Sequence, residues 1–293
     1  MPFFSQRRKQ CGAASLATVL AFHGEAIDAK QLEPLLYIPG KQGTLAIEIQ
    51  AQAREFGYVV YSLEPFLKSI LAEVAAGNPV LVMQNLGLSF LPQWHFAVVV
   101  GYDTGEQSLI LRSGNERRHV VAMKTFINTW ERAGHWAIVI TPSNEIPATA
   151  EPVQFLKAAA ELEEHHSEKA EAAYIAALEH WPEDPNVDKL ARLGLFNIAY
   201  SHKRYAAASA WLLRHPGPVS ADHWNNLAFS LIELGCGEQA LLAVRCALAM
   251  QPENRAYQAS LSELRQRMAR GGAIASKADM QLCGIPGCVL STD

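Results

Sequence analysis

The sequence QRRKQCGAASL at residues 6–16 decides how the first half of the chain is interpreted. It places Cys11 directly before Gly12 and a run of small and apolar residues that predicts a helix over 12–22. A thiol at the first turn of a helix faces unpaired backbone N–H groups and the positive end of the helix dipole, which both favour the thiolate. Gln6 can bring its side-chain amide to the place where an acyl oxyanion would form. The stretch therefore predicts a reactive thiol, and the alternative is a buried cysteine that begins a core helix.

A second stretch, WHFAVVVGYD at residues 94–103, places a histidine in front of an apolar strand. His95 stands at the start of that strand and hence at the sheet edge, where an imidazole can take a proton from a thiol across a cleft. A histidine before a strand often has only a structural role, but its pairing with Cys11 favours a catalytic one. The preceding loop, residues 86–94, is rich in apolar and aromatic side chains and is a candidate wall of the cleft.

Gln6, the run from Cys11 to Ala14 and the run from His95 to Tyr102 together resemble the bacteriocin-leader-processing (double-glycine) cysteine peptidases. The resemblance extends over about residues 1–141 and implies a papain-like α+β fold. It implies Cys11 as nucleophile, His95 as general base and acid, and Gln6 as oxyanion donor. The implied reaction is hydrolysis of a peptide bond through a thioester acyl-enzyme, with a polypeptide substrate and with neither cofactor nor metal.

The chain departs from this family at the residue that orients the imidazole, which is usually an aspartate. If residues 103–107 form a hairpin, strand pairing brings position 113 or 115 opposite His95. Ser113 falls where the family aspartate would lie, and Asn115 offers an amide oxygen. Neither adds a negative charge, so an imidazolium would be less stabilised. Three hypotheses stay open: a thiol peptidase, a weak or inactive peptidase fold that acts as a binding module, and an acyl transferase or amidase.

Short β-branched runs alternate with helical stretches up to residue 143. Strands are predicted at residues 59–61, 80–83, 96–100, 109–111 and 137–140, and helices at 12–22, 44–56 (with Thr44 as N-cap) and 66–76. Turn residues without periodicity then predict a linker at 144–151. The expected N-terminal domain is therefore residues 1–143.

Residues 152–270 form an alanine- and leucine-rich region that repeats itself about every 34 residues. Its small and large residues fall on the pattern of a tetratricopeptide repeat, most clearly from Trp224 to Pro252. This predicts an all-α solenoid of about three repeats plus a capping helix at 256–268. The groove of such a solenoid suits a peptide or protein partner, with Asn197, Asn225 and Asn226 as candidate contacts.

Composition and charge narrow the functional classes. A net charge of −4 gives no electrostatic footprint for nucleic acid. No apolar run is long enough for a membrane helix, and the first residues do not form a signal peptide. These features predict a cytoplasmic protein as the sequence stands, or a cell-envelope or periplasmic protein if a leader is missing.

The five cysteines are too few and too scattered for a disulfide framework. Cys236 and Cys246 are predicted to be small apolar fillers of the last repeat. Cys283 and Cys288 could form a disulfide with each other or provide two soft metal ligands, although the absence of a nearby histidine disfavours zinc. They belong to the tail at 271–293, which is predicted to be poorly ordered.

Overall fold

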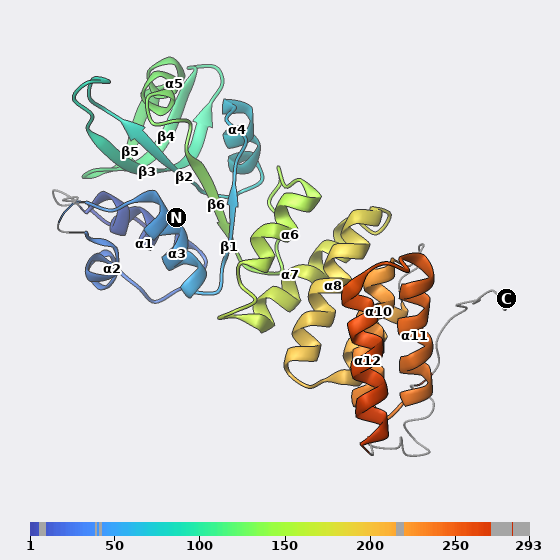
Figure 1. Ribbon diagram of the computed structural model, residues 1–293. Helices are drawn as coiled ribbons and strands as arrows, with labels where there is room; N and C mark the ends of the chain where they lie inside the picture. The colour runs from blue at the N-terminus through green and yellow to red at the C-terminus, as the bar shows by residue number, and fades with distance from the viewer. Residues whose placement is uncertain (6–9, 39, 41–42, 215–219, 271–282, 284–293) are drawn as a thin grey trace. The chain divides into compact units, whose positions relative to one another are not determined.

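The computed structural model describes residues 1–5, 10–38, 40, 43–214, 220–270 and 283 (Figure 1). Contacts between residues divide the chain into two compact units, Met1–His180 and Trp181–Asp293. This division falls later in the chain than the expected linker at 144–151. Apart from Cys283, the tail predicted to be poorly ordered lies outside the described residues.

The first unit contains an antiparallel sheet in the order β1-β6-β2-β3-β4-β5. Its strands are β1 (Val59–Ser62), β2 (Val80–Asn85), β3 (Trp94–Asp103), β4 (Ser108–Ser113), β5 (Glu116–Ala122) and β6 (Ala137–Thr141). The β6 strand is buried along its whole length and β2 along nearly all of it, which is why both are almost unbroken apolar runs in the sequence. The five predicted strands are all present. The sequence analysis missed β5 because ERRHVVA is a largely exposed edge strand with little apolar signal.

Helices cover the sheet on both faces (Figure 1). The helices of the first unit are α1 (Cys11–Phe22), α2 (Ala29–Leu36), α3 (Ala46–Glu55), α4 (Leu67–Ala75), α5 (Met123–Glu131), α6 (Pro152–Ala160) and α7 (Ser167–His180). The α1 side of the sheet carries Phe96 and Val98 of β3, which share a core with α1, α2 and α3. Alternate residues of a strand point to opposite faces, so Gln84, which donates to Thr129 of α5, lies on the other face. The N-terminal domain is therefore α+β with an antiparallel sheet, as predicted.

The segment predicted as a linker is held firmly against the first unit. Glu73 of α4 is completely buried, and its carboxylate accepts hydrogen bonds from the backbone N–H groups of Ala148 and Thr149 and from the Thr149 hydroxyl. The amide of Asn78 donates to the same carboxylate. Residues 148 and 149 are therefore fixed, and α6 follows them in contact with β1.

The second unit contains α8 (Pro185–Ser201), α9 (Tyr205–Leu213), α10 (Ala221–Glu233), α11 (Gly237–Met250) and α12 (Arg255–Ala269). Each of these helices contacts the next one along the chain. No helix among the described residues is long and apolar enough to cross a membrane.

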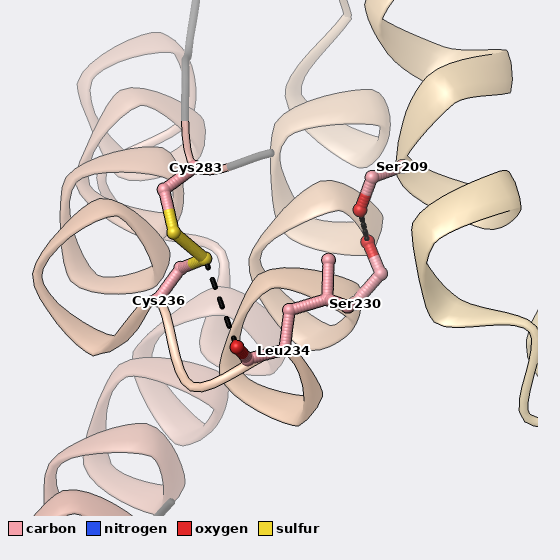
Figure 2. Close-up of a disulfide and its surroundings, with 5 residues drawn as sticks. All are labelled: Ser209, Ser230, Leu234, Cys236 and Cys283. Carbon is pink, nitrogen blue, oxygen red and sulfur yellow. Dashed lines mark hydrogen bonds between the residues drawn. A yellow bond between two sulfur atoms is a disulfide. The ribbon is translucent and has the colours of Figure 1, made fainter. Parts of the chain in front are cut away.

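The cysteines of the second unit differ from their prediction. Cys236 forms a disulfide with Cys283 (Figure 2). Cys246 is disulfide-bonded too. Cys236 and Cys246 are buried, as small fillers would be, but the filler interpretation misses their bonds. The alternatives for Cys283, a bond to Cys288 or a metal site, are wrong because its sulfur is bonded to Cys236. Cys288 itself lies outside the described residues.

Replacing the Glu73 carboxylate tests how much its hydrogen bonds to residues 148 and 149 stabilise the first unit. Glu73→Gln keeps the shape but turns one acceptor into a donor that faces a donor, so the free energy of unfolding should fall by about 2 kcal/mol. Urea denaturation of the whole chain measures it. The control is Glu64→Gln, an exposed glutamate of the same unit, which should change stability little. Equal stability of the two variants would show that the Glu73 hydrogen bonds do not stabilise the first unit.

Candidate active site

Cys11 is the first residue of α1, and its thiol is free and partly buried. Gln10 occupies the N-cap position, but its side chain does not accept a hydrogen bond from the first turn of the helix. The backbone N–H groups of that turn are therefore not satisfied by a capping side chain. The first turn also has no acidic residue. The start of α1 therefore favours negative charge at the Cys11 sulfur and nothing in its own turn opposes it.

Gly12 is required by a close contact with the segment before α3. A methyl group at Gly12 would lie 2.6 Å from Cβ of Thr44. The prediction that Thr44 caps the helix beginning near it is wrong, because Leu45 is the N-cap of α3 and no side chain caps that helix. Thr44 instead packs against the start of α1, so this contact helps to fix the backbone that carries Cys11.

His95 lies at the start of β3, and its Nε2 is 2.8 Å from Oγ of Ser113 at the end of β4. The other candidate, Asn115, accepts a hydrogen bond at 2.7 Å from the hydroxyl of Ser5 instead. Of the two residues considered from the sequence, Ser113 is thus the one in contact with the imidazole. Its hydroxyl can either donate or accept, so unlike a carboxylate it does not by itself fix which ring nitrogen carries the proton.

Burial lowers the pKa of His95 below its ordinary value of 6.5, and the nearby His119 lowers it further. His119 lies on β5, opposite Leu111 of β4. The sequence analysis missed His119 because it did not predict β5, and without that strand nothing connects residue 119 to the site. The environment of His95 therefore favours the neutral imidazole.

The remaining predicted residues are placed as follows. Gln6 lies outside the described residues, although its neighbour Ser5 is bonded to Asn115 two positions after Ser113. The helix α1 packs against β3, but no hydrogen bond joins Cys11 to His95 in the described part of the chain. The structure thus pairs His95 with Ser113, and Cys11 is in no disulfide.

An exposed hydrophobic loop, residues 86–94, leads from β2 into His95. Its large side chains are 51–83% exposed: Leu86, Leu88, Phe90, Leu91 and Trp94. The loop has a defined backbone, because the buried Asn85 side chain accepts from the N–H groups of Gly87 and Gln93 at 2.9 Å. Gly87 is needed there, since a Cβ would lie 2.4 Å from the Leu91 carbonyl oxygen. Five apolar side chains are therefore presented to solvent in an ordered loop next to the candidate general base.

The predicted partner-binding asparagines lie on first helices of the expected repeats. Asn197 of α8 is exposed, whereas Asn225 and Asn226 of α10 are partly buried. The side-chain oxygen of Asn225 is buried without a hydrogen-bond partner. Within the described ranges, no group of three or more His, Cys, Asp or Glu residues is arranged to hold a metal ion.

Residues 1–138 match the model of a family described as the Peptidase_C39-like family. This part of the chain is therefore similar to C39-like peptidases. The match covers the helix that begins with Cys11 and the strand that begins with His95. It supports a cysteine peptidase in the N-terminal part of the chain and does not extend to α6–α12.

Two solved structures are similar to the chain. One is a candidate C39-like peptidase from Bacillus anthracis, with 18% identity and a TM-score of 0.40, covering 48% of this chain and 94% of that one. The other is the peptidase domain of Streptococcus ComA, a bi-functional ABC transporter involved in a quorum sensing pathway. It has 22% identity and a TM-score of 0.37 and covers 47% of this chain and 96% of that one. No curated protein matches the chain.

The pH dependence of thiol alkylation tests the environment of His95. Since the pKa of His95 is lowered, its imidazole stays neutral even somewhat below pH 6.5. In that state it can accept the proton of the thiol. The part of the Cys11 alkylation rate with iodoacetamide that depends on the neutral imidazole should therefore fall only below pH 6.5. Ser113→Asp places a carboxylate at Nε2, favours the imidazolium and should move this midpoint up by about one pH unit.

The measurement is the alkylation rate of Cys11 against pH, followed by mass spectrometry. Asn115→Asp is the matched control, because it adds the same charge to a side chain that contacts Ser5 rather than His95. It should shift the midpoint less. A Ser113→Asp profile that coincides with the wild-type profile would show that Ser113 does not act on the imidazole.

Proposed function

We propose that the chain is a cysteine peptidase that cleaves a polypeptide through a thioester on Cys11. The observation that carries this proposal is the hydrogen bond between His95 and Ser113. It occupies Nε2 and leaves Nδ1 as the nitrogen that can face a thiol. The match of residues 1–138 to C39-like peptidases and the helix-start position of Cys11 support the same chemistry.

The reaction begins when His95 Nδ1 takes the proton of the Cys11 thiol and the sulfur attacks the scissile carbonyl carbon. The developing oxyanion is stabilised by N–H groups at the start of α1 and by the Gln6 amide. The imidazolium then gives its proton to the leaving amine, which leaves a thioester on Cys11. Water attacks that thioester while His95 takes its proton, and the carboxylate product leaves with the thiol restored.

The exposed hydrophobic loop provides the substrate-facing wall of this site. It leads directly into His95, and its backbone is fixed before any substrate arrives by the hydrogen bonds to Asn85. An ordered apolar surface can bind apolar substrate side chains without the entropic cost of ordering a mobile loop. The preferred substrates are therefore polypeptides with apolar residues close to the cleaved bond.

The helical region 152–270 is proposed to be tetratricopeptide repeats that recruit the substrate or a partner protein. Helices α6, α8 and α10 begin at residues 152, 185 and 221, close to the spacing of that repeat. The small residues Ala199, Ala208, Ala228 and Ala240 are all buried, as close helix packing requires. Asn197, which is exposed on α8, is the first candidate contact for such a partner.

Loss of either member of the catalytic pair should abolish cleavage. Cys11→Ala and His95→Ala are expected to reduce the cleavage rate of a peptide library by at least about 100-fold, because a positioned acid–base group contributes 10²- to 10⁴-fold. Mass spectrometry of the products separates hydrolysis from acyl transfer to an added amine. The control is His165→Ala, an exposed histidine between α6 and α7. Cleavage that survives in Cys11→Ala would refute the proposed nucleophile.

Polar substitutions in the exposed hydrophobic loop should weaken substrate binding without affecting the thiol. Phe90→Ser and Leu91→Ser are expected to raise KM several-fold, since each removes large apolar contact area, and to leave the alkylation rate of Cys11 unchanged. Ile47→Ser on α3, where the side chain is 59% exposed, is the matched control. An unchanged KM in both loop variants would exclude the loop from the substrate site.

A further inference from the structure

The disulfide of the second unit closes a long loop of the chain. Cys236 occupies the N-cap position of α11, and Cys283 lies 47 residues further along. The loop between them includes the whole of α11 and α12. The bond therefore holds one point beyond α12 against the turn between α10 and α11 (Figure 2).

This disulfide lies within the hydrophobic core of its unit. Cys236 is 2% exposed and Cys283 is 7% exposed, and both belong to the core that includes Leu231 and Leu264. The Cys236 sulfur is 3.9 Å from the Leu234 carbonyl oxygen, a contact rather than a hydrogen bond because a bonded sulfur carries no proton. The turn is packed closely on its other side, since a Cβ at Gly237 would lie 2.8 Å from the end of Met268. A disulfide shielded in this way from reducing thiols has a structural role and not a switching one.

A second buried cysteine of the same unit is also bonded. Cys246 lies on α11, is 2% exposed and is disulfide-bonded, whereas the free thiol is Cys11. The chain has five cysteines. Three of the four cysteines in the described part of the chain are therefore in disulfides.

We propose that the protein folds and works in an oxidising compartment, where the Cys236–Cys283 bond and the disulfide of Cys246 form while Cys11 keeps a reduced thiol. Structural disulfides persist in such compartments and are rare where glutathione and thioredoxin keep thiols reduced. The inference rests on the proposed function in one respect: it makes the substrate a polypeptide that has already left the reducing cytoplasm.

Each bond forms by exchange with the disulfide of a thiol oxidoreductase. One cysteine thiolate attacks that disulfide, and the second cysteine then attacks the mixed disulfide. Two thiols of this chain lose two electrons and two protons in total, and the oxidoreductase leaves as a dithiol. Cys11 is not consumed in these steps, because its thiol is free.

Thiol trapping in the cells that make the protein tests the inference. Acid-quenched cells are denatured and labelled with a maleimide, then reduced and labelled with a second maleimide of different mass. The full-length chain should carry a first label at Cys11 and second labels at Cys236, Cys246 and Cys283. The control is Cys11→Ser, which should lose that first label and carry the same second labels. First labels on Cys236 and Cys283 would overturn the proposal.

Heating the purified chain gives an independent readout. Addition of dithiothreitol should lower the unfolding midpoint of the second unit by about 10 °C. In the double variant Cys236→Ala/Cys283→Ala the midpoint should start lower and respond less to the reductant. An unchanged midpoint in the wild type would count against a structural role for the bonds.

The two proposals fail separately. Reduction should leave peptide cleavage intact, because Cys11 takes part in neither bond. A chain with one free thiol and no cleavage would refute the peptidase and keep the disulfides. A chain that cleaves peptides with five free thiols in its cell would do the reverse.

Discussion

The burial of α1 against the sheet is the constraint on which the first unit depends. Nine consecutive residues of this helix, from Gly12 to Leu20, are buried, so it has no polar face and can exist only inside a core. Full burial of each large side chain such as Leu16 or Leu20 contributes about 1.5–3 kcal/mol. Gly12 and the two alanines that follow it allow the close approach that this burial requires. Cys11 is the residue at which the helix emerges from the core, so the position of the thiol is a consequence of the packing.

The electrostatics of His95 differ from those of a triad with a carboxylate. A buried aspartate would hold one ring proton at Nε2 and stabilise the imidazolium, whereas Ser113 supplies a dipole that does neither strongly. Burial and His119 both act in the opposite direction and lower the pKa of His95. His95 therefore favours the neutral imidazole, and the free thiol of Cys11 lies at the start of α1. In the proposed mechanism, a substrate that excludes water would strengthen the attraction between the imidazolium and the thiolate.

Most of the first unit was predictable because its central strands are buried on both faces. The strands β2, β3 and β6 are almost unbroken apolar runs, a pattern typical of strands buried on both faces. The elements that the sequence did not predict lack such a run. The edge strand β5 is polar, α2 contains Pro34, and α5 is too short and amphipathic to stand out. Each of these elements forms because a neighbouring element covers its one apolar face. That neighbour lies outside the element itself, so a short stretch of sequence does not reveal the element.

The same limit applies to the site. The positions of Cys11 and His95 follow from local patterns, but the choice between Ser113 and Asn115 depends on the register of β3 and β4. That register includes a bulge between Val99 and Gly101, which no spacing argument contains. The contact between Asn115 and Ser5 also depends on where the N-terminal segment lies.

The cysteine pairing shows how a long-range bond changes the meaning of a local pattern. Cys283 and Cys288 are close in sequence and suggest one small loop, yet Cys283 is bonded to a residue 47 positions earlier. Pairing follows from which helices pack together, and therefore from the core around Cys236. In the described part of the chain, the bonded sulfurs of Cys236 and Cys283 lie in the core of the second unit, whereas the free thiol of Cys11 lies at the edge of the core of the first. A thiol can exchange with an accessible disulfide, so burial of the bonded sulfurs protects them from this reaction.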